Sequence, residues 1–211
     1  MLAEDLPSDA LQHIGNAPLG VPELAGTDLR DAVDRLVDQL RDRQWDGDAE
    51  LADALEAVVA RRPSPLQPLP VELADVGEAL SEPAGTENYL DVHTGTVWFH
   101  TMSDFGVADD LDVDFSDEDR WLFLSGEGST EAYRDLRRFI GTVEDADLAA
   151  RLTLAIEGRG AFGRFRSVLE HDPSEFTRWH RFDADARLGH ARSWLADQGY
   201  QARPARNRNL A

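Results

Sequence analysis

The sequence predicts a mainly helical α+β protein: an N-terminal helical hairpin, then a domain in which a small antiparallel β-sheet packs against about four helices. Three observations predict it. Apolar residues recur with helical spacing over residues 27–62, and a proline-rich run follows at 63–70. The apolar pattern then alternates over residues 88–124 before it becomes helical again. Because prolines remove amide donors and extend the chain, we expect a domain boundary at this run.

The N-terminal part is expected to hold two helices. Residues 1–26 carry scattered prolines and glycines and predict a loosely ordered leader. Thr27 is a plausible N-cap for a helix to about Gln44, and Asp48 for a second helix to about Ala60. A short connection makes these two a helical hairpin, and residues 63–70 a semi-rigid linker.

The second part is expected to begin with a short helix, Val71 to Leu80, followed by strands. Residues 89–92 and 96–99 alternate around Gly95, which can supply the positive φ of a hairpin turn. A third strand is expected at residues 120–125. These strands account for the sheet of the predicted α+β domain.

The rest of the chain is predicted to be helical. We expect helices at 130–140, from a capping box at residues 142–145 to Glu157, at 161–170 and at 184–198. The domain therefore spans about 71–200, and residues 201–211 form a basic tail. The predicted core consists of Leu90, Val97, Phe99, Leu122, Leu124, Tyr133, Leu136, Phe139, Leu148, Leu152, Ile156, Phe162, Phe165, Leu169, Trp194 and Leu195.

Charge is distributed unevenly along these 211 residues, whose formal net charge is −20. Residues 1–150 hold 10 arginines and 34 acidic residues, a net charge of −24, whereas residues 151–211 hold 11 arginines and 7 acidic residues, a net charge of +4. Such asymmetry marks a basic contact surface, or an arginine-rich end that pairs with acidic residues of the same chain. The absence of cysteine excludes disulfides and thiol catalysis.

The segment GRGAFGRFR, residues 158–166, fits the glycine pattern of a dinucleotide loop, but no strand precedes it. We interpret its glycines as structural. Gly158 is expected to end one helix as a left-handed cap, Gly160 to let the next begin, and Gly163 to let two helices approach closely. Phe162 and Phe165 are expected to face the core.

Four stretches, YLDVHTG, AYRDLRRFI, LAIEGRGAFGRFRSVL and RWHRF with ARSWLADQG, resemble the bacterial uncharacterised protein family number 0158. The resemblance covers about residues 71–200, and the hairpin at 27–62 lies outside it. It supports the domain boundary. Because the family has no established activity, the resemblance implies no catalytic residues.

One candidate binding surface is a cationic cluster interleaved with aromatic residues in the C-terminal helices. Its members are Arg159, Arg164, Arg166, Arg178, His180, Arg181 and Arg187. Arginine suits bidentate contacts with phosphate or carboxylate, and the helix start near Gly160 also favours an anion. The alternative is that the aromatic side chains are core and the arginines pair with neighbouring Asp and Glu residues.

These observations favour a non-enzymatic cytoplasmic interaction or adaptor protein with an unidentified protein partner. Nucleic-acid or nucleotide binding through the same cluster is the alternative, and an acid/base enzyme site between sheet and helices is a third. The six histidines show no metal-ligand spacing, and no enzyme motif is present. We therefore predict no metal, no cofactor and no membrane segment, and the sequence predicts no oligomeric state.

Overall fold

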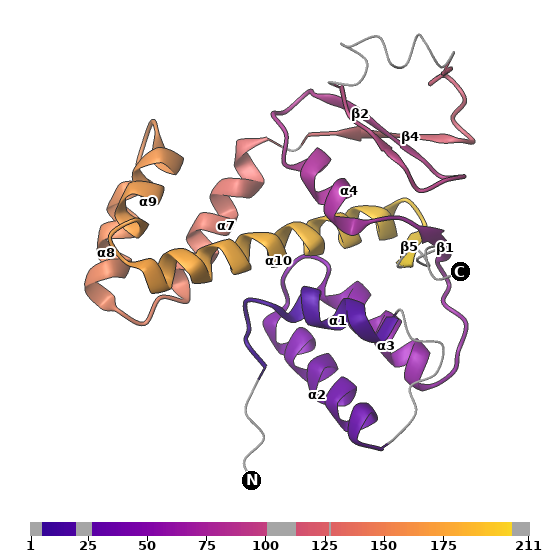
Figure 1. Cartoon of the computed structure of the whole chain (residues 1–211), viewed down its shortest axis with the longest axis horizontal. Helices are drawn as coiled ribbons and strands as arrows, with labels where there is room; N and C mark the ends of the chain where they lie inside the picture. Colours follow the sequence, from indigo (N-terminus) through magenta and orange to yellow (C-terminus); the bar gives the residue numbers. More distant parts are fainter. Residues whose placement is uncertain (1–5, 20–26, 101–112, 127, 204–211) are drawn as a thin grey trace, which may run out of the picture.

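One long helix, α10 (Pro173–Asp197), runs through the middle of the molecule (Figure 1). This computed structural model describes residues 6–19, 27–100, 113–126 and 128–203. Helix α10 contacts α1, α3, α4, α7, α9 and β5, so parts far apart in the sequence meet on it. The fold is mainly helical α+β with a small antiparallel sheet, as predicted. None of the described helices is both long and apolar enough to cross a membrane.

The N-terminal part is a three-helix unit of α1 (Leu11–Leu19), α2 (Thr27–Arg43) and α3 (Asp48–Val59). The hairpin of α2 and α3 is confirmed, whereas α1 lies in the predicted leader. Gly15 of α1 was interpreted as a loop signal. A Cβ on Gly15 would lie 2.6 Å from Leu51 Cδ2, so this glycine instead lets α1 approach α3 closely. The unit, named the N-terminal unit below, has its own apolar core.

The predicted linker at 63–70 contains a strand, β1 (Gln67–Pro70), which pairs in parallel with β5 (Tyr200–Arg203). Leu69 and Ala202 face each other in this register, and both are buried. The prolines are compatible with a strand because this sheet has two strands, each of which is an edge. The predicted basic tail likewise begins inside β5, and residues 204–211 lie outside the described part.

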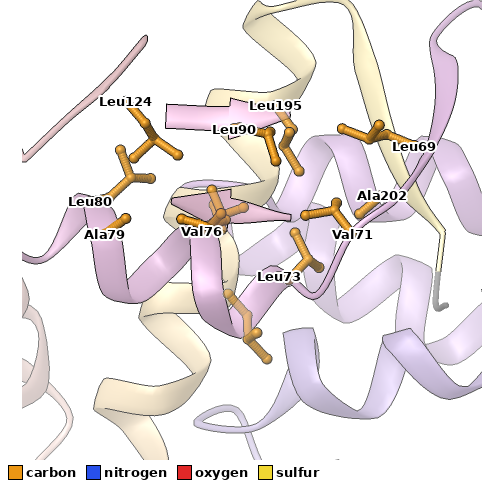
Figure 2. Packing of buried hydrophobic residues seen from close by; sticks show 13 residues of the cluster. Leu69, Val71, Leu73, Val76, Ala79, Leu80, Leu90, Leu124, Leu195 and Ala202 are labelled. Atoms are coloured by element: carbon orange, nitrogen blue, oxygen red, sulfur yellow. The ribbon is translucent and has the colours of Figure 1, made fainter. Parts of the chain in front are cut away.

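The sheet, α4 and α10 form successive layers above the N-terminal unit (Figure 1). Strand β2 (Glu87–Asp91) lies between β3 (Val97–Trp98) and β4 (Trp121–Ser125), and both pairings are antiparallel. Helix α4 (Leu73–Leu80) packs on this sheet. Figure 2 shows side chains of α4, the sheet, α10, β1 and β5 meeting in one cluster. The helices that follow the sheet in sequence pack with α10 in a separate cluster.

The later helices are α7 (Ser129–Gly141), α8 (Ala146–Ala155) and α9 (Ala161–Leu169). They share a core with the first half of α10. Rings of Phe139, Phe165, Trp179 and Phe182 contact one another there, with centroids 4.9–6.0 Å apart. Such ring pairs stabilise a core beyond the area that they bury.

Three helix starts differ from the sequence prediction. Helix α10 begins at Pro173 rather than 184, because the Asp172 side chain accepts hydrogen bonds from Ser174 N and Glu175 N. Helix α8 is capped by Asp145 rather than by a box from Thr142. Helix α3 has Gly47 as its N-cap, since the Asp48 side chain is used elsewhere.

Most of the predicted core is confirmed. The buried members are Leu90, Val97, Leu124, Leu136, Phe139, Leu148, Leu152, Ile156, Phe165, Leu169 and Leu195. Phe99, Leu122, Tyr133 and Trp194 are partly buried against the same clusters. The prediction was wrong for Phe162, which is 44% exposed.

Candidate functional site

A groove of about 460 Å³ opens between the start of α7 and the turn that joins α8 to α9. Its lining combines hydroxyl groups, apolar side chains and exposed backbone, and consists of Ser129, Thr130, Tyr133, Ile156, Gly158, Gly160, Ala161 and Phe162. Concave sites with this mixture and size suit small ligands or a few side chains of a partner. In Figure 1, α8 and α9 lie at the opposite end of the molecule from β1 and β5.

The turn between α8 and α9 is held in place by its own residues. Gly158 and Gly160 have φ of +74° and +75°, a region that glycine adopts without strain. Arg164 folds back over the turn and donates from Nε to the Ala155 carbonyl at 3.0 Å, and from its other nitrogens to the carbonyls of Glu157 and Arg159. This guanidinium therefore satisfies carbonyls at the end of α8. Gly160 is the N-cap of α9, whereas α8 ends at Ala155 with Ile156 as its C-cap, so Gly158 lies beyond the cap position predicted for it.

Two other predictions for this segment were wrong. A Cβ on Gly163 would meet nothing within 4 Å, so this glycine does not mediate a close helix approach. Phe162 lies on the groove, although Phe165 and Leu169 of the same helix are buried. Spacing of three and seven residues predicted one face for all three, but the buried residues of α9 are Ala161, Phe165 and Leu169, which recur every four residues and leave Phe162 beside this stripe.

The predicted cationic cluster does not form one surface, because most of its members pair within the chain. Arg178 donates to both Glu175 oxygens at 2.6–3.1 Å and stacks over Phe139. Arg181 pairs with Asp9 at 2.6 Å, and Arg187 with Asp183 at 2.9 Å. The interleaved aromatic residues Phe165, Trp179 and Phe182 belong to the core.

Arg181 and Arg187 are exposed although they are paired, and Arg159, Arg166 and His180 are exposed as well. Within the described residues, the Arg159 guanidinium makes no ion pair or hydrogen bond, and this residue stands between the two glycines that line the groove. The Arg166 side chain is 70% exposed, and its Nε lies 3.6 Å from Oε1 of Glu170. His180 is exposed and contacts the Phe176 ring. The groove and Arg159 together are the part of the predicted surface that is open to a partner.

Comparisons with known proteins identify the second part of the chain. The model of an uncharacterised protein family, UPF0158, matches residues 66–210. The chain belongs to this family. The UPF0158 protein PA5073 of Pseudomonas aeruginosa strain PAO1 is similar, with 26% identity over 137 residues, which cover 64% of this chain and 88% of that protein. No solved structure matches the chain. The family boundary at residue 66 lies just before β1, close to the predicted boundary at 71.

A second candidate site, which the sequence did not predict, is the junction between the UPF0158 region and the N-terminal unit. Arg43 lies at its centre and bonds Asp48 at 2.6 and 2.9 Å and Asp185 of α10 at 2.8 Å. Gln12 of α1 donates to Asp48 at 2.8 Å and accepts from Arg192 at 2.9 Å. We name this set the buried charge network.

Burial shifts the pKa of groups in this network. It raises the pKa of Asp185, against the opposing charge and hydrogen bond of Arg43. It also lowers the pKa of Arg192 to about 10, against the charges of Glu50, Asp185 and Asp48. Backbones approach closely beside the network, since a Cβ on Gly189 would lie 2.2 Å from the Asp46 carbonyl oxygen. These groups hold the N-terminal unit against α10.

A half-buried cluster at the edge of the junction has one feature of a metal site. Ligand atoms of Asp46, Glu131 and His190 all lie within 4.8 Å of one another. However, Arg138 bonds Asp46 at 2.7 Å, and Arg134 pairs with both Asp46 and Glu131. A divalent cation would have to displace two guanidinium groups, so we assign no metal there.

Proposed function

We propose that this UPF0158 protein is a non-enzymatic, cytoplasmic interaction protein that binds a segment of a partner protein in the groove between α7 and the α8–α9 turn. The observation that carries the proposal is the position of Phe162. A large aromatic side chain is 44% exposed on the wall of a groove of about 460 Å³. Exposed aromatic residues at preformed hollows are typical of the anchors of protein interfaces.

The shape of the groove wall supports this proposal. Gly158 and Gly160 bring backbone, rather than side chains, to the surface, and Arg164 of α9 holds the turn through hydrogen bonds to its carbonyls. A wall that keeps its shape before binding loses little conformational freedom when a partner docks. A partner segment can therefore bind without first ordering the turn.

Nucleic-acid or nucleotide binding through the arginines is the alternative proposal, and Arg159 beside the start of α9 is the observation that favours it. Pairing of Arg178, Arg181 and Arg187 with carboxylates leaves fewer donors for phosphate than the sequence suggested. Phosphate binding would weaken steeply with salt, whereas an apolar protein interface would not.

The proposal is tested by photo-crosslinking in native lysate. A photoreactive phenylalanine analogue replaces Phe162 in one chain and Phe123, which is 51% exposed on β4, in a control chain. We expect a defined protein adduct at position 162 that survives nuclease, is absent at 123, and is competed by unlabelled wild-type chain. Adducts that disappear with nuclease would favour the alternative, and identical adducts at both positions would contradict the proposal.

Competition by two variants of α9 separates docking from folding. Phe162→Ala should compete poorly while keeping the wild-type stability within about 1 kcal/mol, because its side chain is already half exposed. Phe165→Ala, three residues along, should cost about 3–5 kcal/mol because it leaves a cavity in the core. Urea unfolding of both variants measures the difference. Loss of stability in Phe162→Ala equal to that in Phe165→Ala would mean that Phe162 is structural.

A further inference from the structure

The α8–α9 end of the molecule differs in charge from the rest of the chain. From the start of α8 to the end of α9, residues 146–170 hold four arginines and three acidic residues, whereas the whole chain has a formal net charge of −20. Of these arginines, Arg164 is engaged with carbonyls of the turn, but Arg159 and Arg166 extend toward solvent. A basic site on an acidic protein attracts negative groups locally, since charges further away than about 8 Å are screened at physiological salt.

The same end exposes apolar side chains. Leu154 of α8 is 66% exposed and Phe162 of α9 is 44% exposed, and both belong to the small set of large apolar residues that are exposed in the described part of the chain. The groove beside Phe162 adds Ile156 and Tyr133 to this surface. The α8–α9 segment therefore exposes both cations and apolar side chains, and a matching partner needs both kinds of group.

From this complementarity, and resting on the proposed function, we infer that the partner segment is acidic and apolar together. Its aromatic or aliphatic side chain enters the groove against Phe162, and a neighbouring Asp or Glu pairs with Arg159. The apolar side chain supplies most of the affinity, because a rim ion pair in water contributes little by itself. The carboxylate supplies register and selects against neutral or basic segments.

The test is a selection from a random peptide library displayed on phage. The library is panned on the immobilised full chain at physiological salt and counter-selected on Phe162→Ala. We expect the remaining peptides to carry Asp or Glu beside Phe, Trp, Leu or Ile. A synthetic copy of one such peptide should lose about tenfold in affinity when its acidic residues become Asn or Gln.

Charge variants of the full chain complete the test. Arg159→Glu should weaken the selected peptide by about tenfold, and a peptide with Lys in place of its acidic residues should recover binding to this variant. Arg30→Glu, an exposed charge reversal on α2 in the N-terminal unit, is the matched control and should leave the affinity unchanged. Equal effects of the two reversals would overturn the inference, because they would show a general charge effect.

Three other outcomes have distinct meanings. Selected peptides that are neutral or basic, yet need Phe162, would overturn the inference and leave the proposed function standing. Absence of any Phe162-dependent peptide would contradict both. A labelled single-stranded RNA that competes with the peptides, depends on Arg159 and weakens steeply with salt would reassign the site to a phosphate-bearing partner.

Discussion

The junction beneath α10 and the groove at the α8–α9 turn are built from the same kinds of residue but use them differently. At the junction, Arg43 is buried between two carboxylates, and the backbones of Gly47 and Gly189 touch. At the groove, Arg159 extends into solvent and Gly163 has open space around it. Whether an arginine or a glycine is structural or available therefore depends on what the rest of the chain places next to it, and not on residue type.

The largest expected difference between the two kinds of arginine can be measured on helix α2. Arg43→Met should cost about 3–5 kcal/mol, because it leaves the buried carboxylates of Asp48 and Asp185 without their cation. Arg41→Met, two residues earlier, removes a pair with Asp53 that is exposed to water and should cost less than about 1 kcal/mol. Urea unfolding at neutral pH measures both. Similar losses of stability in the two variants would show that the buried charge network does not hold the N-terminal unit against α10.

Glycines provide the second contrast, because Gly189 and Gly163 both lie inside helices. Gly189→Ala should destabilise the chain by about 1–3 kcal/mol, since its Cβ would lie 2.2 Å from the Asp46 carbonyl oxygen. Gly163→Ala should stabilise it by about 0.5–1 kcal/mol, because alanine favours a helix and meets no neighbour there. Thermal unfolding of the two variants gives the signs. A destabilised Gly163→Ala would restore the close helix approach that the sequence suggested.

The smallest expected effect is a pH dependence at the edge of the junction. Burial alone would raise the pKa of Asp46, but the hydrogen bond and charge of Arg138, with the charges of Arg134 and His190, outweigh it and lower the pKa. A lowered pKa contributes stability that is present above the unfolded value of about 3.9 and is lost as the pH falls through the folded value. The contribution should be below about 1 kcal/mol, because the group is half open to solvent.

Comparison of wild type with Asp46→Asn isolates this contribution. The stability difference between the two chains should be constant from neutral pH to about pH 5 and should shrink below about pH 4. Unfolding measured across this range, in a buffer of constant ionic strength, checks the sign. A difference that grows on acidification would show that burial, and not Arg138, dominates at Asp46.

The sequence predicted elements whose signals are local. The helices of the N-terminal hairpin, the three strands and the glycine N-cap of α9 follow from periodicity and glycine position. The start of α10 was also readable, because Asp172, Pro173 and Glu175 supply an N-cap, a first-turn proline and a first-turn acidic residue. The helix predicted from the spacing of apolar residues begins only at residue 184, so it does not include this first part of α10.

Features that depend on contacts between distant segments were not predictable from one sequence. Arg43 and Asp185 are 142 positions apart, and nothing in the local pattern of either indicates the other. Arg181 and Asp9, which also pair, are 172 positions apart. For the same reason the cationic cluster was too broad, since sequence alone does not show which arginines find carboxylates within the fold.

The parallel pairing of β1 with β5 determines when the UPF0158 region can complete its fold during synthesis. Residues 11–59 are synthesised before the UPF0158 region and have a core of their own. Strand β1 follows at once, but the strand that it pairs with is nearly the last described segment to be synthesised. Because contacts between distant segments form only after the chain between them is closed, the UPF0158 region completes its fold only after β5 has been synthesised. Until then β1 is an unpaired edge, which its prolines protect from pairing with other chains.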